Sequence, residues 1–547
     1  MKRLSLTKTG TWLVAAAALL VVSTGSARED DEHGGDLRHG GDLNGQLAQR
    51  LKEAGFTGKV QQSLPTQLGR PINAALFDLG RLLFHDNILG THSDNSCAGC
   101  HSAAVGFADT QSIAIGTDNN GIVGPSRTGP RNQRRAPQIV NSGFYPALML
   151  NTRFTSISHN SFDTSEGVRL PFFLGGTTVF TPGAACTPGT CFDPAKITTL
   201  LSVQGHLPPT ELIEMAGFSF ENPADADPRL YHPAHVVSSG VMASTVPSAI
   251  AGPNGSPPDS IDTSYAIRAR LLVNRFNTNP AYIAKFAAIY PEAAGGNITF
   301  AMIGAALAEF QIANTFANAP LDKFARGDRQ AMTDQQKRGA LIFLGKGNCV
   351  ACHAVAGKSN EMFSDFENHV VGIPQIAPAS FGLRRGGNPL NPADFPGNFL
   401  FAGPNNDQDF GREEEGDVTD RYKFRSSPLR NLAVQPTFFH NGSFTKLADA
   451  LRYHMNPKAM YPSYSPAAQN LDLDLRVRRG PIEPVFQRLD PLIVSLSKVK
   501  FSRDEFDDLL VFMYDGLLDP GILPANLCRQ VPKTVPSGIR VQVFQGC

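Results

Sequence analysis

The sequence has neither an excess of charge of one sign nor a long apolar stretch after its N-terminal segment, and both absences restrict the possible functions. Its 49 basic and 49 acidic residues balance, so no excess of positive charge indicates nucleic acid or an anionic membrane surface as a partner. Beyond the N-terminal segment, no stretch approaches the roughly 18 apolar residues that span a bilayer. We therefore expect neither a nucleic-acid partner nor a membrane-embedded domain.

The N-terminus has the layout of an export signal. Basic residues at its start precede an apolar run through Val22, and small residues follow as far as Ala27. The run is short for a membrane span, so we expect cleavage after Ala27 and export to the periplasm, with an uncleaved anchor as the alternative. The only tryptophan, Trp12, lies in this segment, so the exported protein would contain none.

Four of the eight cysteines form a repeated pattern, Cys-x-x-Cys-His, at 97–101 and 349–353. Two thiols at this spacing can each form a thioether to a haem vinyl group, while the histidine binds the iron. A thioredoxin-like pair does not need the histidine, and neither copy has a second cysteine pair to complete a zinc site. The sequence therefore predicts two covalently bound haem c groups. The first would use Cys97, Cys100 and His101, and the second Cys349, Cys352 and His353.

The other four cysteines suit an oxidising compartment. Cys186 and Cys191 close a short loop, and Cys528 and Cys547 lie near the C-terminus. Of the three possible pairings, the one with the shortest loops joins Cys186 to Cys191 and Cys528 to Cys547. We expect this pairing, in which the second disulfide pins the tail.

Helical patterns precede both haem motifs. Residues 74–86 are apolar at helical spacing, and 333–349 begin with a capping box. Residues 155–205 and 220–262 are rich in Pro, Gly, Ser and Thr, which favours irregular surface insertions. The sequence therefore predicts a mainly α fold with two cytochrome c-like haem domains and long irregular insertions.

Composition divides the chain into five parts. We expect a signal peptide (1–27), a flexible leader (28–65), an N-terminal haem domain with insertions (66–325), a C-terminal haem domain (326–520) and a tail (521–547).

Several longer blocks surround the motifs. They include LGRLLFHDNILG, RRAPQIVNSGFYPALMLNTRF, FANAPLDKFARGD, KRGALIFLGKGNCVACH and FRSSPLRNLAVQPTFFHNGSFTKLADALRYHM. In this order they resemble the bacterial di-haem cytochrome c peroxidase/MauG superfamily over roughly residues 70–520. The resemblance implies that hydrogen peroxide reacts at the N-terminal haem and that the C-terminal haem relays electrons. The donor would be a small redox protein, such as a cytochrome c or cupredoxin, or a protein or organic substrate.

The resemblance places the sixth ligand of the second haem on the helix that follows FHNG. Counted from His440, the usual methionine position falls on His454, where MauG-like members have a tyrosine. His454 shares a helix face with Leu447 and Leu451, whereas Met455 lies about 100° around the helix. We expect His454 to bind the iron, with Met455 as the alternative.

The resemblance also implies an open face on the first haem. Relatives that need reductive activation carry a blocking histidine at a position where this chain has Thr117. His159 and His206 are the alternatives that could approach the iron from an insertion.

The segment VQGHLPPTELIEM matches the family's spacing for the residues on that open face, at Gln204, Pro208 and Glu214. Glu214 would move a proton between the peroxide oxygens, Gln204 would donate or accept a hydrogen bond, and Pro208 would shape the pocket. The alternative is an ordinary helix start, with Thr210 as its cap and Glu211 and Glu214 in its first turn.

Two residues depart from the family's pattern. Leu150 stands where many members have a tryptophan between the haems, so an indole relay is excluded. Arg135 stands where an asparagine side chain helps to bind calcium between the domains. A guanidinium cannot bind Ca²⁺ but can replace its charge. Calcium held by backbone carbonyls is therefore a disfavoured alternative.

Together these patterns favour a periplasmic, peroxide-dependent oxidoreductase of unspecified oligomeric state. The alternatives are MauG-like oxidation of a protein or organic substrate, a pure electron-transfer cytochrome, and a haem dioxygenase. The open face and the spacing of Gln204 and Glu214 argue against electron transfer alone. A carboxylate that moves protons suits a peroxidase better than a dioxygenase.

Overall fold

The computed structural model describes residues 42–129, 131–169, 179–180, 197–216, 267–268, 271–376, 408–415 and 417–547. Residues 42–547 belong to one unit of packed chain. The predicted signal peptide, the Cys186–Cys191 pair and most of the predicted insertions lie outside the described residues. No helix in the described ranges is both long and apolar enough to cross a membrane.

The fold is mainly α, as the sequence predicts, and its strands are short. The α-helices are α1 (Leu43–Glu53), α2 (Val60–Leu68), α3 (Ala74–His85), α4 (Cys97–Cys100), α5 (Leu200–Gln204), α8 (Pro280–Ala287), α9 (Phe300–Ala313), α10 (Pro320–Ala325), α11 (Asp334–Leu344), α12 (Leu447–Met455), α13 (Pro457–Met460), α14 (Glu483–Phe486), α15 (Pro491–Leu496), α16 (Arg503–Val511) and α17 (Pro524–Leu527). The strands are β1 (Ile122–Val123), β2 (Ala147–Leu148), β3 (Phe154–Ser156), β4 (Val168–Arg169), β5 (Val179–Phe180), β6 (Asn368–His369), β7 (Phe424–Arg425) and β8 (Val543–Phe544).

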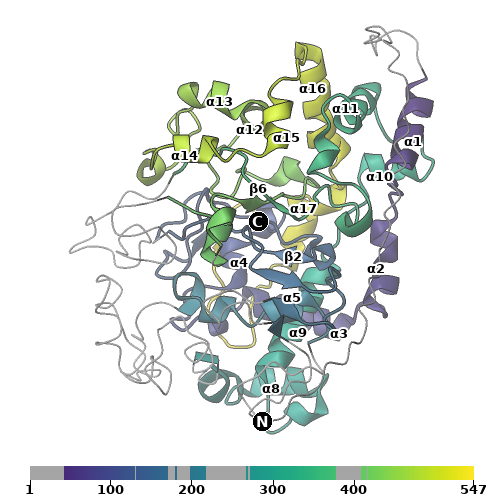
Figure 1. Cartoon of the computed structure of the whole chain (residues 1–547). Coiled ribbons are helices and arrows are strands. Elements are labelled where there is room, and N and C mark those ends of the chain that lie inside the picture. Colours follow the sequence, from purple (N-terminus) through teal and green to yellow (C-terminus); the bar gives the residue numbers. More distant parts are fainter. Residues whose placement is uncertain are drawn as a thin grey trace, which may run out of the picture. The chain divides into compact units, whose positions relative to one another are not determined.

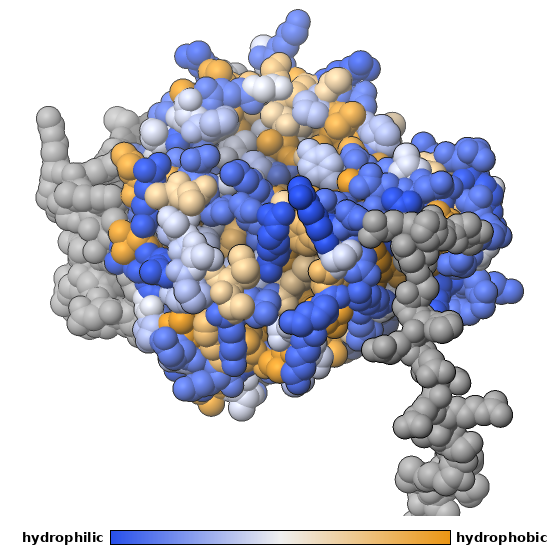
Figure 2. All heavy atoms as spheres, turned by 90° about the horizontal axis from the view of Figure 1, so that it is seen from above, coloured by the Kyte–Doolittle hydropathy of each residue, from blue (hydrophilic) through white to orange (hydrophobic). Residues whose placement is uncertain are grey.

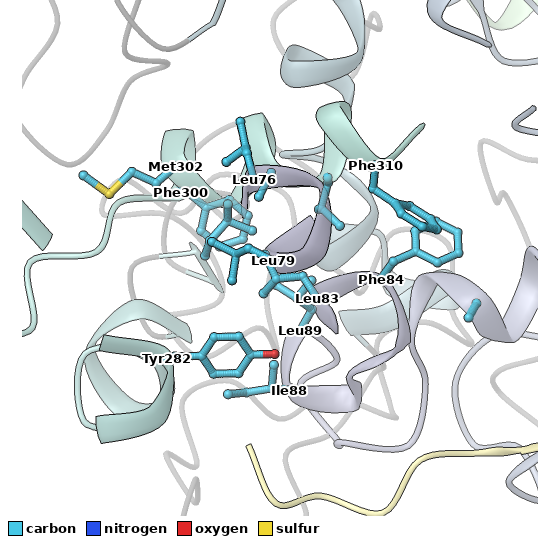
Figure 3. Packing of buried hydrophobic residues seen from close by; sticks show 14 of the residues in the cluster. Leu76, Leu79, Leu83, Phe84, Ile88, Leu89, Tyr282, Phe300, Met302 and Phe310 are labelled. Carbon is cyan, nitrogen blue, oxygen red and sulfur yellow. The ribbon is translucent and has the colours of Figure 1, made fainter. Parts of the chain in front are cut away.

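The first haem motif follows α3, which packs against α9 (Figure 1). Gly80 of α3 allows the two helices to approach closely, since a Cβ at this position would collide with the carbonyl oxygen of Ala306. Around this crossing lies a buried apolar cluster that includes Leu83, Phe84 and Phe310 (Figure 3). The helix before the first motif is thereby anchored to a segment more than 200 residues away in the sequence.

The second half repeats this arrangement. The predicted capping box is confirmed, since Thr333 Oγ1 accepts from Gln336 N and Gln336 Oε1 accepts from Thr333 N. This box starts α11, which packs against α16 where a Cβ at Gly339 would collide with Asp508 O. Each motif thus follows a helix that a later helix covers through a glycine contact.

The polar leader is more ordered than its composition indicates. The sequence predicts flexible chain up to residue 65, but α1 and α2 form within it and bury Leu47, Leu51, Val60 and Leu64. The prediction is wrong for residues 43–65 because these few apolar side chains recur at helical spacing and find partners in the core.

The tail returns to the first half. The predicted disulfide between Cys528 and Cys547 is confirmed. Strand β8 pairs in parallel with β1, and Gln542 accepts from Ser96 and donates to Asp94 O, just before the first motif. The other strands form a sheet in the order β2-β3-β4-β5 and the pair β6-β7.

The outer surface mixes residue types. On the face shown in Figure 2, hydrophilic residues predominate and hydrophobic ones lie in small groups between them. This is the composition expected of a surface in contact with water.

Candidate haem-binding sites

The first motif forms a short helix with His101 at its end. Cys97 and Cys100 carry free thiols, so both are available for thioether bonds. Burial raises the pKa of each thiol to about 12. Burial also lowers the pKa of His101 to about 4, which keeps the imidazole in the neutral form that binds a metal. These residues fit a covalently attached haem.

The second motif places two histidines opposite one another. His353 Nδ1 donates to the carbonyl oxygen of Phe363 at 3.0 Å, which leaves Nε2 for a metal. The ring centres of His353 and His454 lie 6.2 Å apart. Bonds of about 2 Å from one metal to two imidazole nitrogens give a separation of about 6 Å. The pair therefore fits an iron held between the two rings.

His454 and Met455 on α12 point to different surroundings, as the helical register predicts. Leu447 and Leu451 are buried on the same helix as His454, and burial lowers the pKa of His454 to about 3. His454 Nδ1 is buried and has no hydrogen-bond partner among the described residues. Met455 is partly buried and packs against the apolar cluster that contains Phe444 and Tyr453. His454, rather than Met455, thus faces His353.

Glu214 lies beside the first motif. Asn95 Nδ2 donates to the carbonyl oxygen of Glu214 at 2.7 Å, and Thr91 N donates to Met215 O at 3.1 Å. Glu214 is close enough to both motif thiols for its charge to raise their pKa further. Burial, helped by the charge of Glu211 and opposed by Arg153, raises the pKa of Glu214 to about 7. At neutral pH such a carboxyl both gains and loses protons readily.

Thr210 and Glu211, which precede Glu214, do not have the roles expected of a helix cap and a solvated first-turn residue. Thr210 Oγ1 donates to Leu207 O at 2.9 Å instead of capping a helix, so the alternative with Thr210 as a cap is wrong. Glu211 is not a solvated first-turn residue, since it is half-buried and lies 3.7 Å from the guanidinium of Arg153. Burial raises its pKa as well.

Gln204 and Pro208 precede Glu214 along the chain. Gln204 ends α5, Pro208 begins the turn Pro208–Thr210, and both are half-buried. Among the described residues, no hydrogen bond joins the side chains of Gln204 and Glu214. Of the three residues, Glu214 is the one that is hydrogen-bonded to the segment just before the first motif.

Thr117 and the two alternative histidines can also be placed. Thr117 is buried. His206 is held against α9: its Nδ1 bonds Ser202 O at 2.7 Å, and its ring centre is 5.8 Å from that of Phe300. His159 lies in the turn after β3.

The two departures from the family's pattern lie between the halves of the chain. Leu150 is buried, and its carbonyl oxygen accepts from Arg425 N at 2.8 Å. The guanidinium of Arg135 donates to the backbone carbonyl of Thr437 and to Gln435 Oε1. Burial lowers the pKa of Arg135 to about 10, so it is charged at neutral pH. A positive charge thus already lies among these oxygen atoms.

Sequence reasoning missed His369, which lies beside the second motif. Its Nε2 bonds Asp365 at 2.9 Å and its Nδ1 bonds Asp490 at 2.8 Å, while Cys352 Sγ lies 4.0 Å away. Burial opposes the charged ring, but these partners raise the pKa of His369 to about 11. No sequence signal reveals this cluster, because Asp490 is 121 residues from His369.

The comparisons with known proteins agree with this arrangement. The sequence model of the di-haem cytochrome c peroxidase family matches residues 74–239 and 240–330, which include the first motif and Glu214. Over these residues the chain is similar to the di-haem cytochrome c peroxidase/MauG superfamily. The two c-type haems that this family implies agree with the two motifs.

Curated relatives carry both names of the superfamily. A cytochrome-c peroxidase IdrP2 from Denitromonas iodatirespirans is 29% identical over 34% of this chain and 48% of its own length. A methylamine utilization protein MauG from Methylorubrum extorquens is 29% identical over 38% of this chain and 49% of its own. The chain thus spans about half the length of these relatives. A solved MauG-like protein associated with microbial copper homeostasis is 20% identical, with a TM-score of 0.46, over 83% of this chain and 91% of that one.

Proposed function

We propose that this protein is a periplasmic di-haem peroxidase that reduces hydrogen peroxide at its N-terminal haem with electrons relayed through its C-terminal haem. The observation that carries the proposal is the difference between the motifs. A carboxyl group with a pKa near 7 lies beside the first motif, and a second imidazole lies opposite His353 at the second. The first suits proton transfer, and the second suits electron transfer.

The residues of this chain have distinct parts in that reaction. A haem bound at the first motif supplies the iron that binds peroxide and the electrons that reduce it. Glu214 would accept a proton from the near oxygen of peroxide and return it to the far oxygen, which leaves as water when the O–O bond breaks. The near oxygen would leave as a second water after two electrons and two protons have arrived. Arg153 opposes the rise in the pKa of Glu214. Pro208 and the turn that it begins restrict access to Glu214.

A haem held by both His353 and His454 would have no position left for peroxide. An imidazole in place of a thioether ligand also lowers the reduction potential expected of this haem. Its partner is a small redox protein or another electron donor. With leucine at position 150 and Trp12 in the proposed signal peptide, electrons cross between the haems by tunnelling or through a tyrosine.

A MauG-like oxidation of side chains on a partner protein is the second candidate. Thr117 in place of a blocking histidine favours it, because the first haem then reacts without prior reduction. Steady turnover of peroxide with a reduced cytochrome c or cupredoxin supports the first candidate. Turnover only with an oxidisable protein or organic substrate supports the second.

Replacing the proposed proton carrier tests the mechanism. Glu214→Gln keeps the shape of the side chain and removes the proton transfer, so peroxide turnover is expected to fall by about 10²–10⁴-fold. The wild-type kcat/KM is expected to rise with pH up to about 7, as the carboxylate forms, and this step is expected to be lost in the variant.

The matched control is Glu483→Gln, an exposed first-turn glutamate on α14, which is expected to leave turnover unchanged. Glu211→Gln is unsuitable as a control because Glu211 is half-buried beside Arg153. A Glu214→Gln variant with wild-type turnover would remove Glu214 from the mechanism.

A further inference from the structure

Arg425 is a buried cation without a carboxylate partner. The residue is 6% exposed, and its Nη1 donates to Ala147 O at 3.2 Å. Its guanidinium carbon lies 5.4 Å from the ring centre of Tyr145 and 5.6 Å from that of Phe366. Among the described residues no Asp or Glu pairs with it, and its Nε is buried without a hydrogen-bond partner. Burial lowers its pKa to about 10, so it still carries its charge at neutral pH.

Two other buried arginines in the protein are matched with carboxylates. Arg430 makes two bonds to Asp322, at 2.8 and 2.9 Å. Arg134 makes two to Asp409, at 2.7 and 2.6 Å.

In the described part of the chain, Arg127 and Arg135 also lack a carboxylate, but each donates to more than one neutral oxygen atom. Arg425 differs because, among the described residues, only Nη1 of its guanidinium is hydrogen-bonded. A guanidinium removed from water is strongly disfavoured unless an anion accompanies it.

Arg425 lies where the two halves of the chain meet beside the second motif. Its backbone nitrogen donates to Leu150 O in the first half at 2.8 Å. The next residue, Ser426, donates from Oγ to the carbonyl oxygen of Cys352 at 3.0 Å. The strand β7 that carries Arg425 therefore runs along the segment that attaches the second haem.

We propose that Arg425 binds a propionate carboxylate of the second haem on the side that faces residues 147–150. A haem brings two such carboxylates. With Nη1 bonded to Ala147, the donors left on the guanidinium are Nε and Nη2, which together form the side-on pair that accepts a carboxylate in a bidentate fashion. The rings of Tyr145 and Phe366 hold the guanidinium plane in place.

This pairing has an electrical consequence. A positive charge fixed beside the porphyrin favours the reduced iron, so Arg425 raises the reduction potential of the second haem. It offsets part of the lowering that a second imidazole ligand causes. The inference rests on two bound haems with His454 on the second, but it does not depend on peroxide turnover.

The test measures the reduction potential of each haem in the purified holoprotein, without peroxide, by optical titration. The second haem, with two imidazole ligands, is expected to be low-spin, and the first, with an open face, high-spin. Arg425→Gln is expected to shift the potential of the low-spin haem downward and to leave that of the high-spin haem unchanged. Arg425→Lys keeps the charge and is expected to restore most of the potential. The control Arg421→Gln removes a positive charge from the same region, where Arg421 pairs with Glu413, and is expected to shift neither haem.

Mass spectrometry of each variant establishes that both haems are attached. An unchanged low-spin potential in Arg425→Gln, or a shift confined to the high-spin haem, overturns the proposal. If Arg425→Gln does not assemble, resonance Raman spectra of the wild type and Arg425→Lys decide. The propionate bending band of the low-spin haem must differ between them, and identical bands overturn the proposal.

Discussion

The two Cys-x-x-Cys-His motifs share a scaffold and differ in what surrounds it. Each follows a helix that packs through a glycine against a later helix, α3 against α9 and α11 against α16. Around the first motif, residues 204–216 bring two carboxyl groups, and Arg153 lies beside them. Around the second, α12 brings a histidine and β7 an unpaired arginine. The repeated part attaches the haem, and the unrepeated part determines its chemistry.

The C-terminal tail adds a second difference. It is closed by the disulfide, and through β8 and Gln542 it contacts the loop around the first motif. The loop after the second motif is contacted instead by the N-terminal segment, since Thr57 and Gly58 donate to Glu361. The two motifs thus differ in which end of the chain contacts them.

Removing one attachment site has the largest expected effect on this comparison. Replacing Cys349 and Cys352 together by serine removes both thioether bonds of the second haem. Mass spectrometry after denaturation is expected to show one covalent haem in place of two, and the remaining haem is expected to be the high-spin one. A low-spin haem as the survivor would reverse the assignment of the two motifs.

Opening the tail is expected to have a smaller effect. The disulfide closes a loop with a sequence separation of 19, for which the entropic model gives about 3 kcal/mol of stabilisation. Replacing Cys528 and Cys547 by serine is therefore expected to lower the melting temperature. Because the tail contacts the first half, hydrogen exchange is expected to rise in residues 94–127 and to stay unchanged around 349–369.

If hydrogen exchange in that variant changed by the same amount in both regions, relative to the wild type, the tail would not stabilise the first half selectively. The matched control is the serine variant of one cysteine alone, since it breaks the same bond and leaves a free thiol.

Chelation is expected to have the smallest effect. Arg135 already places a positive charge among the oxygen atoms of Thr437 and Gln435, so no calcium ion is needed there. Adding EGTA to the purified protein is expected to leave its spectra and melting temperature unchanged. A chelator that lowers either one, with recovery on adding calcium, would contradict this role of Arg135.

Local features of the sequence predict the repeated parts well. The capping box at Thr333 and Gln336 involves residues three apart. The position of His454 follows from the family's spacing after His440 together with helical register. The sequence also predicts the proximity of Glu214 to the first motif, through its resemblance to the family. These features depend on neighbours in sequence or on a family's spacing.

Contacts between distant segments were beyond sequence reasoning. Arg153 changes the environment of Glu211 from 58 positions away, and Asp490 lies 121 positions from His369. The missing carboxylate of Arg425 is likewise visible only when its surroundings are folded. Burial and the pairing of charges depend on the whole chain, so the sequence predicts which residues matter more readily than how their pKa values are set.

The electron paramagnetic resonance spectrum of the oxidised wild-type protein tests the central comparison most directly. If the two motifs do different work, the resting protein gives one high-spin ferric signal from the first haem and one low-spin signal typical of two imidazole ligands from the second. The second signal is expected to disappear in His454→Ala and to persist in Met455→Leu. Two low-spin signals in the wild type, or a histidine–methionine signal that Met455→Leu abolishes, would contradict the account.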